Sequence, residues 1–135
     1  MGTIVQGKIQ NANCKMQSKR KDLSERLLEF AASGIRFTVR LSRSAVGRYI
    51  ANQFMRASAS AGANYEEACG AESRADFIHK MQLVLKESRE SLYWLKLAER
   101  AELAPANDLQ PLLNKANELI KIVAKSVITA KAKEK

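Results

Sequence analysis

Apolar residues recur along most of this chain at intervals of three and four residues, which is the period of an α-helix. In the first periodic segment they are Leu23, Leu27, Phe30, Gly34, Phe37 and Leu41. Asp22 and Glu25 have the spacing of a reciprocal N-terminal cap, so we expect this helix to begin near residue 22. Residues 1–20 show no such period and contain lysine and arginine but no acid, which predicts a flexible basic N-terminal arm.

A second helix is expected to begin after Ser42 or Ser44 and to run to about Cys69, where Gly70 provides the stop. Small residues dominate its apolar stripe, which consists of Ile50, Phe54, Ala57, Ala61, Tyr65 and Ala68. Small side chains let a neighbouring backbone approach closely. The run from Ala57 to Tyr65 therefore predicts a tight contact with another helix.

Two more helices follow. Ser73 and Asp76 form a capping box for a helix that runs to about Glu102. After Pro105 breaks the chain, Asp108 can cap a last helix in which Pro111 would lie in the first turn. The apolar stripe of this last helix is wide, which predicts contact on more than one side and therefore a contact with another subunit.

Four helices joined by short links favour antiparallel neighbours. The predicted fold is all-α, an antiparallel up-and-down four-helix bundle. We divide the chain into the basic N-terminal arm (1–20), the bundle (21–131) and a basic C-terminal tail (132–135).

Catalytic and metal-binding motifs are scarce in this sequence. His79 is the only histidine, and it offers no base for a nucleophilic triad. Glu87 and Glu90 lack the following histidine that a di-iron bundle needs, and no phosphate loop or zinc cluster occurs. We predict a protein that is not an enzyme, with no catalytic residue, no metal and no cofactor.

Two cysteines, Cys14 and Cys69, are too few for a disulfide framework, so we expect free thiols. No apolar stretch is long enough to cross a bilayer. Together these features predict a cytoplasmic protein with no membrane partner.

The charge balance is the strongest positive signal. The chain carries 23 Lys and Arg against 14 Asp and Glu, a net charge of +9. This surplus suggests an anionic partner, nucleic acid before a membrane surface, although solubility alone remains an alternative. No acid occurs from Phe30 through Tyr65. The candidate nucleic-acid-binding residues are Lys19, Arg20, Lys21, Arg36, Arg40, Arg43, Arg48, Lys121 and Lys125.

Arg36, Arg40 and Arg43 follow steps of four and three and should line one strip. The planar guanidinium suits phosphate oxygens. No aromatic residues interleave this patch, so we expect recognition of backbone and shape rather than base stacking. For Arg56 we favour an internal pair with a carboxylate.

Residues 52–97 closely resemble the family of 23S rRNA-intervening-sequence proteins, and the resemblance extends more weakly over residues 22–130. The residues that carry it are Gln53, Arg56, Ser60, Asn64, Tyr65, Glu67, Ser73, Asp76, Phe77, Lys86, Glu87, Glu90, Tyr93, Trp94 and Leu95. The resemblance implies a small cytosolic bacterial bundle, often encoded inside insertions in ribosomal RNA genes. Related bundles assemble as homopentamers, and a similar fold serves as the accessory protein of diversity-generating retroelements, where it works with a reverse transcriptase and its RNA.

The resemblance implies no enzymatic activity, and the shared polar residues are better explained as architecture. Arg and carboxylate on facing helices satisfy each other, within a chain or between subunits. The predicted structural polar network consists of Arg56, Asn64, Glu67, Glu87 and Glu90.

Two hypotheses about function remain open at this point. The first is a homo-oligomeric bundle that binds structured RNA or a ribonucleoprotein through its basic surface. The second is a protein-interaction scaffold, such as an accessory subunit of a retroelement reverse transcriptase, whose charge is incidental. Consumption of Arg36, Arg40 and Arg43 in intersubunit salt bridges would favour the scaffold.

Overall fold

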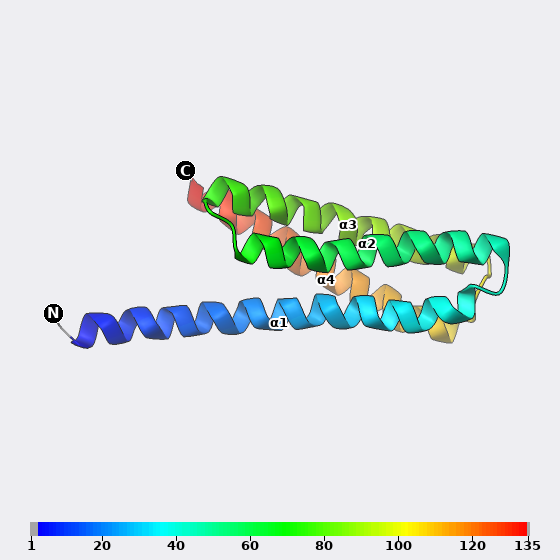
Figure 1. Ribbon diagram of the computed structural model, residues 1–135, viewed down its shortest axis with the longest axis horizontal. Helices are drawn as coiled ribbons and strands as arrows, with labels where there is room; N and C mark the ends of the chain where they lie inside the picture. Colours follow the sequence, from blue (N-terminus) through cyan, green and yellow to red (C-terminus); the bar gives the residue numbers. More distant parts are fainter. Residues whose placement is uncertain (1–2, 135) are drawn as a thin grey trace.

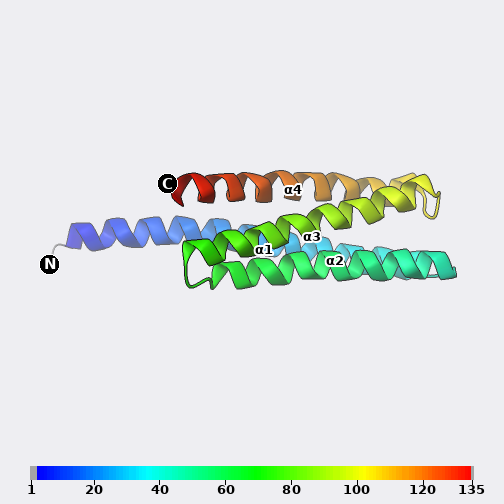
Figure 2. The same cartoon turned by 90° about the horizontal axis from the view of Figure 1, so that it is seen from above.

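The protein was analysed as a computed structural model, which describes the backbone of residues 3–134 and the side chains of residue 20 and residues 22–133. The described chain forms four helices: α1 (Thr3–Leu41), α2 (Ala45–Cys69), α3 (Arg74–Arg100) and α4 (Ala106–Glu134). Consecutive helices run in opposite directions (Figures 1 and 2). The predicted all-α, up-and-down four-helix bundle is therefore confirmed.

The start of the first helix is the main correction to the sequence analysis. α1 begins at Thr3, so Asp22 lies in the middle of a helix and does not cap one. Residues 3–21 contain no proline and a single glycine, Gly7, so nothing in them stops a helix that the packed part has already nucleated. The hydrophobic period is absent there because most of this part of α1 extends past the ends of the other three helices (Figure 1).

The second and third helices begin at the serines expected of them. The Ser44 hydroxyl accepts a hydrogen bond of 3.0 Å from the amide of Gly47, and Ser44 rather than Ser42 is the cap. The Ser73 hydroxyl likewise accepts a 3.0 Å bond from the amide of Asp76. At the end of α2, the backbone N–H of Gly70 donates a 3.1 Å hydrogen bond to the carbonyl of Glu67. Local capping chemistry therefore placed these three helix ends correctly.

The last helix begins at Ala106, three residues earlier than a cap at Asp108 predicts. The carbonyl of Pro105 accepts from the amides of Asp108 and Leu109, at 3.0 and 3.3 Å, which closes the first turn without a side-chain cap. As a result, Asp108 lies inside the first turn and Pro111 falls in the second. The carboxylate of Asp108 is thereby free to reach across to α1.

The core lies along α2, which contacts α1 on one side and α3 on the other. The α2–α3 contact is the most extensive, whereas α1 and α4 share the smallest contact of the four. Ala57, Ser58 and Ala61 in the small-residue run are almost completely buried. Gly34 of α1 packs against the ring of Phe54, which a β-carbon at position 34 would overlap. The run of small residues therefore serves helix packing, as its composition suggested.

The wide apolar stripe of α4 is mostly covered within the chain. Leu113 and Ala116 are buried, Ile120 and Ala124 are half-buried, and only Ile128 is well exposed, at 69%. Contacts inside one chain therefore account for most of its width, and this stripe does not itself require a second subunit. No helix in the part of the chain that the structure describes is long and apolar enough to cross a membrane.

Candidate nucleic-acid interface

Four of the predicted binding arginines gather at one end of the bundle, around the α1–α2 turn. Arg36 and Arg40 lie on the last turns of α1, Arg43 lies in the turn, and Arg48 lies on the first turns of α2. All four side chains are exposed to solvent. We call these four residues the turn arginines.

Two of the turn arginines pair with carboxylates of the same chain. Arg36 Nη2 donates to Glu29 Oε1 at 2.7 Å and to Ser33 Oγ at 3.0 Å. Ser33 Oγ in turn donates to Glu29 Oε1 at 3.2 Å. The hydrogen bond from Arg36, and after it the one from Ser33, lowers the pKa of Glu29 below its ordinary value. Arg40 Nη1 lies 3.3 Å from Asp108 Oδ2 on α4.

These two pairs leave the cations accessible. The side chains of Arg36 and Arg40 are 65% and 68% exposed although they are paired. Ion pairs this exposed contribute little to stability, because water and salt screen them. A phosphate that arrives at this surface can therefore replace the carboxylate at small cost.

The other two turn arginines have no carboxylate partner among the described side chains. Arg43 makes no ion pair there, and Arg48 Nη1 donates only a long 3.4 Å hydrogen bond to the carbonyl of Ser42. A guanidinium held only by a carbonyl keeps most of its donors free. Arg43 and Arg48 are therefore the best-placed anion ligands of the turn.

The remaining predicted binding residues lie elsewhere on the molecule. Lys121 and Lys125 are exposed on α4, and Arg20 is exposed on α1. The side chains of Lys19 and Lys21 lie outside the described residues. The predicted set thus forms no single patch: the structure brings the turn arginines together and separates them from the basic residues of α4.

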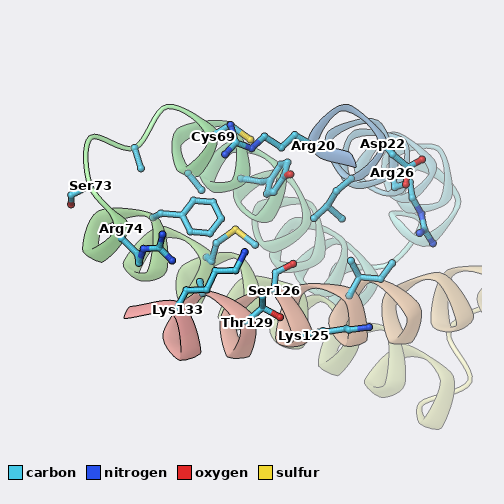
Figure 3. A pocket seen from close by; sticks show the side chains of 18 residues that line it. Arg20, Asp22, Arg26, Cys69, Ser73, Arg74, Lys125, Ser126, Thr129 and Lys133 are labelled. Carbon is cyan, nitrogen blue, oxygen red and sulfur yellow. The ribbon is translucent and has the colours of Figure 1, made fainter. Parts of the chain in front are cut away.

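Lys125 and Arg20 line a cavity of about 1120 Å³ at the other end of the bundle, where α1 and α4 diverge (Figure 3). Its charged lining residues are Arg20, Asp22, Arg26, Arg74, Lys125 and Lys133. Tyr65 and Phe77 are among its apolar lining. Sequence reasoning missed this cavity because its walls come from all four helices.

Burial raises the pKa of Tyr65 well above that of an exposed tyrosine, and the neighbouring Cys69 adds to the effect. Cys69 itself is a free thiol. His79 is exposed on α3. Among the described side chains, no group of three His, Cys, Asp or Glu residues is arranged to hold a metal ion.

Three of the five predicted polar-network residues meet across the α2–α3 seam. Arg56 pairs with Glu87 at 3.3 Å between Nη1 and Oε2, and its other terminal nitrogen pairs with Glu90. The Gln53 side-chain oxygen accepts a 3.4 Å bond from Arg56 Nε, and Trp94 Nε1 donates to Glu90 at 3.1 Å. One cation on α2 is therefore matched by two carboxylates on α3.

The other two members of that predicted network lie apart from it. Asn64 Nδ2 donates to the carbonyl of Ser60 at 2.9 Å within α2, and Glu67 pairs with Lys80 at 3.4 Å. Asn64 and Glu67 lie about two to three helical turns beyond Arg56. Spacing in the sequence could not show that Arg56, but not Asn64 or Glu67, faces Glu87 and Glu90.

An aromatic cluster lies next to the turn arginines, and the expectation that no aromatic interleaves the basic patch was therefore wrong. Tyr49, which follows Arg48, meets Trp94 of α3 edge-on with ring centroids 5.9 Å apart. Tyr93 meets the same Trp94 ring at 5.2 Å. Tyr49 and Tyr93 are 58% and 57% exposed. The cluster joins residues some 45 positions apart, so only the pairing of α2 with α3 reveals it.

Comparisons with known proteins agree with this fold. The crystal structure of a protein of unknown function from the S23 ribosomal protein family of Bacteroides thetaiotaomicron superimposes on the chain with a TM-score of 0.73. The two are 32% identical, and the match covers 78% of this chain and 97% of the other. No curated protein matches the chain significantly. The model of the 23S rRNA-intervening sequence protein family matches residues 21–125, and the chain therefore belongs to this family.

Proposed function

We propose that this protein is a non-enzymatic, homo-oligomeric, cytoplasmic bundle that binds structured RNA or a ribonucleoprotein through its basic surface. The observation that carries the proposal is the group of turn arginines, Arg36, Arg40, Arg43 and Arg48. They lie exposed at one end of the bundle, in a segment of chain that contains no acid. Arginine is the side chain best suited to phosphate oxygens, because its planar fork can donate two parallel hydrogen bonds.

The charge of the whole chain supports the same proposal. A net charge of +9 on 135 residues attracts polyanions at long range, and assembly of several chains would multiply the field. The family name refers to an intervening sequence of 23S rRNA, and RNA is a polyanion of the kind that such a surface would attract. Binding of this type releases condensed counterions and therefore weakens steeply as salt rises.

Self-association is supported by the outer face of α1. Leu28, Ile35 and Val39 are 63%, 50% and 71% exposed. With the half-buried Ala32 they follow steps of four, three and four, which is the seam pattern of a coiled coil. A second copy of the chain would cover these side chains, and a pentamer is the assembly that the family resemblance suggests. This seam on α1, rather than the stripe on α4, is the feature that supports an oligomer.

A protein-interaction scaffold is the second candidate, in particular an accessory subunit of the reverse transcriptase of a diversity-generating retroelement. The observation in its favour is that Arg36 and Arg40 already face Glu29 and Asp108 within the chain. If these pairs persist in the assembled protein, only Arg43 and Arg48 of the four turn arginines are available to bind RNA. The attraction of the turn for RNA would then be weaker than the net charge of the chain suggests.

The proposal is tested by binding a fluorescent RNA hairpin across a series of salt concentrations. We expect the affinity to fall steeply with salt, and the variant Arg36→Glu/Arg40→Glu/Arg43→Glu to bind at least about tenfold more weakly, since three phosphate contacts become repulsive. The matched control is Arg74→Glu/Lys131→Glu/Lys133→Glu, which reverses three exposed cations at the other end of the bundle.

Affinity that does not respond to salt, or a turn variant that binds as tightly as its control, would overturn the RNA proposal in favour of the scaffold. Light scattering during gel filtration, with absorbance recorded at two wavelengths, gives the assembly mass and shows any nucleic acid that co-purifies. A monomer would contradict the oligomer proposed from the α1 seam.

A further inference from the structure

We propose that the outer face of α3 is a binding site for single-stranded nucleic acid, with Tyr93 as the residue on which a base stacks. The inference rests on the proposed RNA-binding function and assigns a path for the unpaired strand. The site is one stripe at steps of three and four residues: Lys86, Arg89, Tyr93, Lys96 and Arg100. All five side chains are exposed. At 1.5 Å per residue the stripe is about 21 Å long.

The four cations of this stripe are not neutralised by neighbouring acids. None of them takes part in an ion pair among the described side chains. Three carboxylates are adjacent to these cations in sequence: Glu87 and Glu90 are turned to the α2–α3 seam by Arg56, and Glu99, beside Arg100, is exposed and makes no ion pair among the described side chains. Besides its part in packing, Arg56 neutralises two carboxylates that could otherwise pair with the cations of the stripe.

The spacing of these charges is unfavourable for a helix that has only to stay folded. Lys86 and Arg89 are three residues apart, and Lys96 and Arg100 are four apart, so like charges lie side by side. A surface that serves solubility alone usually mixes the two signs. Repulsion between the like charges of this stripe lowers stability. Binding of a polyanion along the stripe would explain why the charges are nevertheless present.

An aromatic ring in the middle of the stripe indicates that the polyanion is single-stranded. The Tyr93 ring is exposed, and the edge-on contact with Trp94 restrains it. Trp94 is itself held by its hydrogen bond to Glu90 and by its contact with Tyr49. Every base has a π-face that can stack on such a ring, but in a duplex those faces are covered by neighbouring pairs. Cations that follow a backbone and a ring between them therefore suit an unpaired strand.

The stripe also leads towards the turn arginines. Tyr49 near the start of α2 contacts Trp94, and Arg56 one to two turns later contacts Glu87 and Glu90, so the two helices run antiparallel. Lys96 and Arg100 therefore lie at the same end of the bundle as the turn (Figure 2). An RNA whose folded part rests on the turn arginines could extend its unpaired end along α3.

The stacking role is tested with an oligouridine of about twelve nucleotides, which has no stable secondary structure, and with a blunt RNA duplex as a second probe. Tyr93→Ala should bind the oligouridine about 5- to 100-fold more weakly, the range that loss of one stacked base produces. Tyr93→Phe should bind like the wild type because it retains the ring, and neither variant should bind the duplex differently. Trp94 is the only tryptophan, so quenching of its emission by the oligouridine should accompany binding.

The electrostatic role is tested by two double variants, Arg89→Gln/Lys96→Gln in the stripe and Arg74→Gln/Lys131→Gln at the end of the bundle away from the turn, which remove the same amount of charge. Loss of two phosphate contacts should lower the slope of log affinity against log salt by about 1.4 for the oligouridine, since each contact to a single strand contributes about 0.7. The control pair should leave the slope unchanged. Circular dichroism checks that all variants remain helical.

The outcomes separate this site from the proposed function. If the wild type binds neither the hairpin nor the oligouridine, the RNA-binding function itself fails. If it binds the hairpin, but Tyr93→Ala and Arg89→Gln/Lys96→Gln bind the oligouridine as the wild type does, the α3 site fails while the function stands. Equal weakening by the two charge pairs would also overturn the site, because it would mean that the charge acts without a defined path.

Discussion

Arg56 and Arg43 occupy the same acid-free stretch of sequence, yet the structure gives them opposite surroundings. Arg56 faces two carboxylates of α3 across the α2–α3 seam. Arg43, in the α1–α2 turn, faces solvent and makes no ion pair among the described residues. The difference lies in what the neighbouring helix presents. An arginine opposite a helix that presents acids stabilises packing, whereas one at a turn remains available to a ligand.

The same contrast separates the two faces of α3. On the seam, Glu87 and Glu90 are matched by Arg56, and the side chain of Glu87 is only 14% exposed. On the outer face, four cations and Tyr93 follow one another at steps of three and four residues. We therefore expect substitutions in the interior and the seam to change stability, and substitutions on the outer faces to change binding.

The largest effect on stability is expected where α1 meets α2. Gly34→Ala places a methyl group against the buried ring of Phe54 and should lower the free energy of unfolding by about 1–3 kcal/mol, as overpacking does. Gly62→Ala is the matched control: its β-carbon would meet Leu27 Cβ at 3.9 Å, an ordinary contact. This control should be neutral or stabilising by up to about 1 kcal/mol, because alanine favours a helix over glycine. Urea unfolding at one protein concentration measures both, and equal behaviour of the two variants would contradict the close α1–α2 approach.

The second prediction concerns the seam. Arg56→Ala leaves Glu87 and Glu90 without their cation and should cost about 1–2 kcal/mol of unfolding free energy, less than a fully buried pair because Arg56 is 47% exposed. Arg43→Ala should stay within about 0.5 kcal/mol of the wild type. Urea unfolding of both variants measures the two changes in unfolding free energy. An Arg43 substitution as costly as that of Arg56 would remove the distinction between the two arginines.

That comparison has an internal check. Replacing Glu87 and Glu90 with glutamine in the Arg56→Ala background should recover part of the lost stability, because the carboxylates then no longer repel each other. A further loss instead would show that the carboxylates stabilise the seam through partners other than Arg56.

The third prediction uses pH and compares an interior tyrosine with an exposed one. Burial raises the pKa of Tyr65 in the folded protein, while the unfolded chain titrates near 10. Above pH 10 the unfolded state therefore releases a proton that the folded state retains, and stability falls by up to about 1.4 kcal/mol per pH unit. Tyr65→Phe should remove this loss, and Tyr93→Phe should not. Identical alkaline profiles for wild type and Tyr65→Phe would contradict burial of that hydroxyl.

The smallest expected effect is a gain. Lys96→Gln removes a like-charge neighbour of Arg100 one turn away and should stabilise the protein by about 0.2–0.5 kcal/mol, even as it weakens binding of single-stranded RNA. Thermal unfolding in low salt gives the sign. Loss of stability would indicate that Lys96 supports the fold, which would weaken the assignment of the outer stripe to a ligand.

Capping chemistry and hydrophobic period were sufficient to predict much of this fold. Ser44, Ser73 and Gly70 act on backbone groups within a few residues of themselves, so their roles are visible in the local sequence. The start of α1 was predicted wrongly for the converse reason. Asp22 and Glu25 have the spacing of a cap, but they do not start a helix here because no residue before them stops the helix that begins at Thr3.

The candidate site was predicted less well than the fold. The turn arginines were predicted from a run of sequence without acids; only Arg36 and Arg40 lie on one strip of α1, whereas Arg43 lies in the turn and Arg48 on α2. Arg36 pairs with Glu29 on the same helix, and Arg40 pairs with Asp108 on α4. Only the first of these pairs could have been predicted from spacing along the sequence. The cations of the α3 stripe were not among the predicted binding residues, because Glu87 and Glu90 lie between them in sequence and nothing local shows that these acids point to α2.

By itself, the sequence determined the helices, their order, the family and the positive charge, because period, caps and composition act over a few residues or over the whole chain. The tertiary structure decided which charges cancel and which remain. Coulomb interactions depend on distances between side chains on different helices, and packing of α2 on α3 sets those distances. The assignment of Arg56 to the seam, and of Tyr93 and its cations to an open face, follows from that packing.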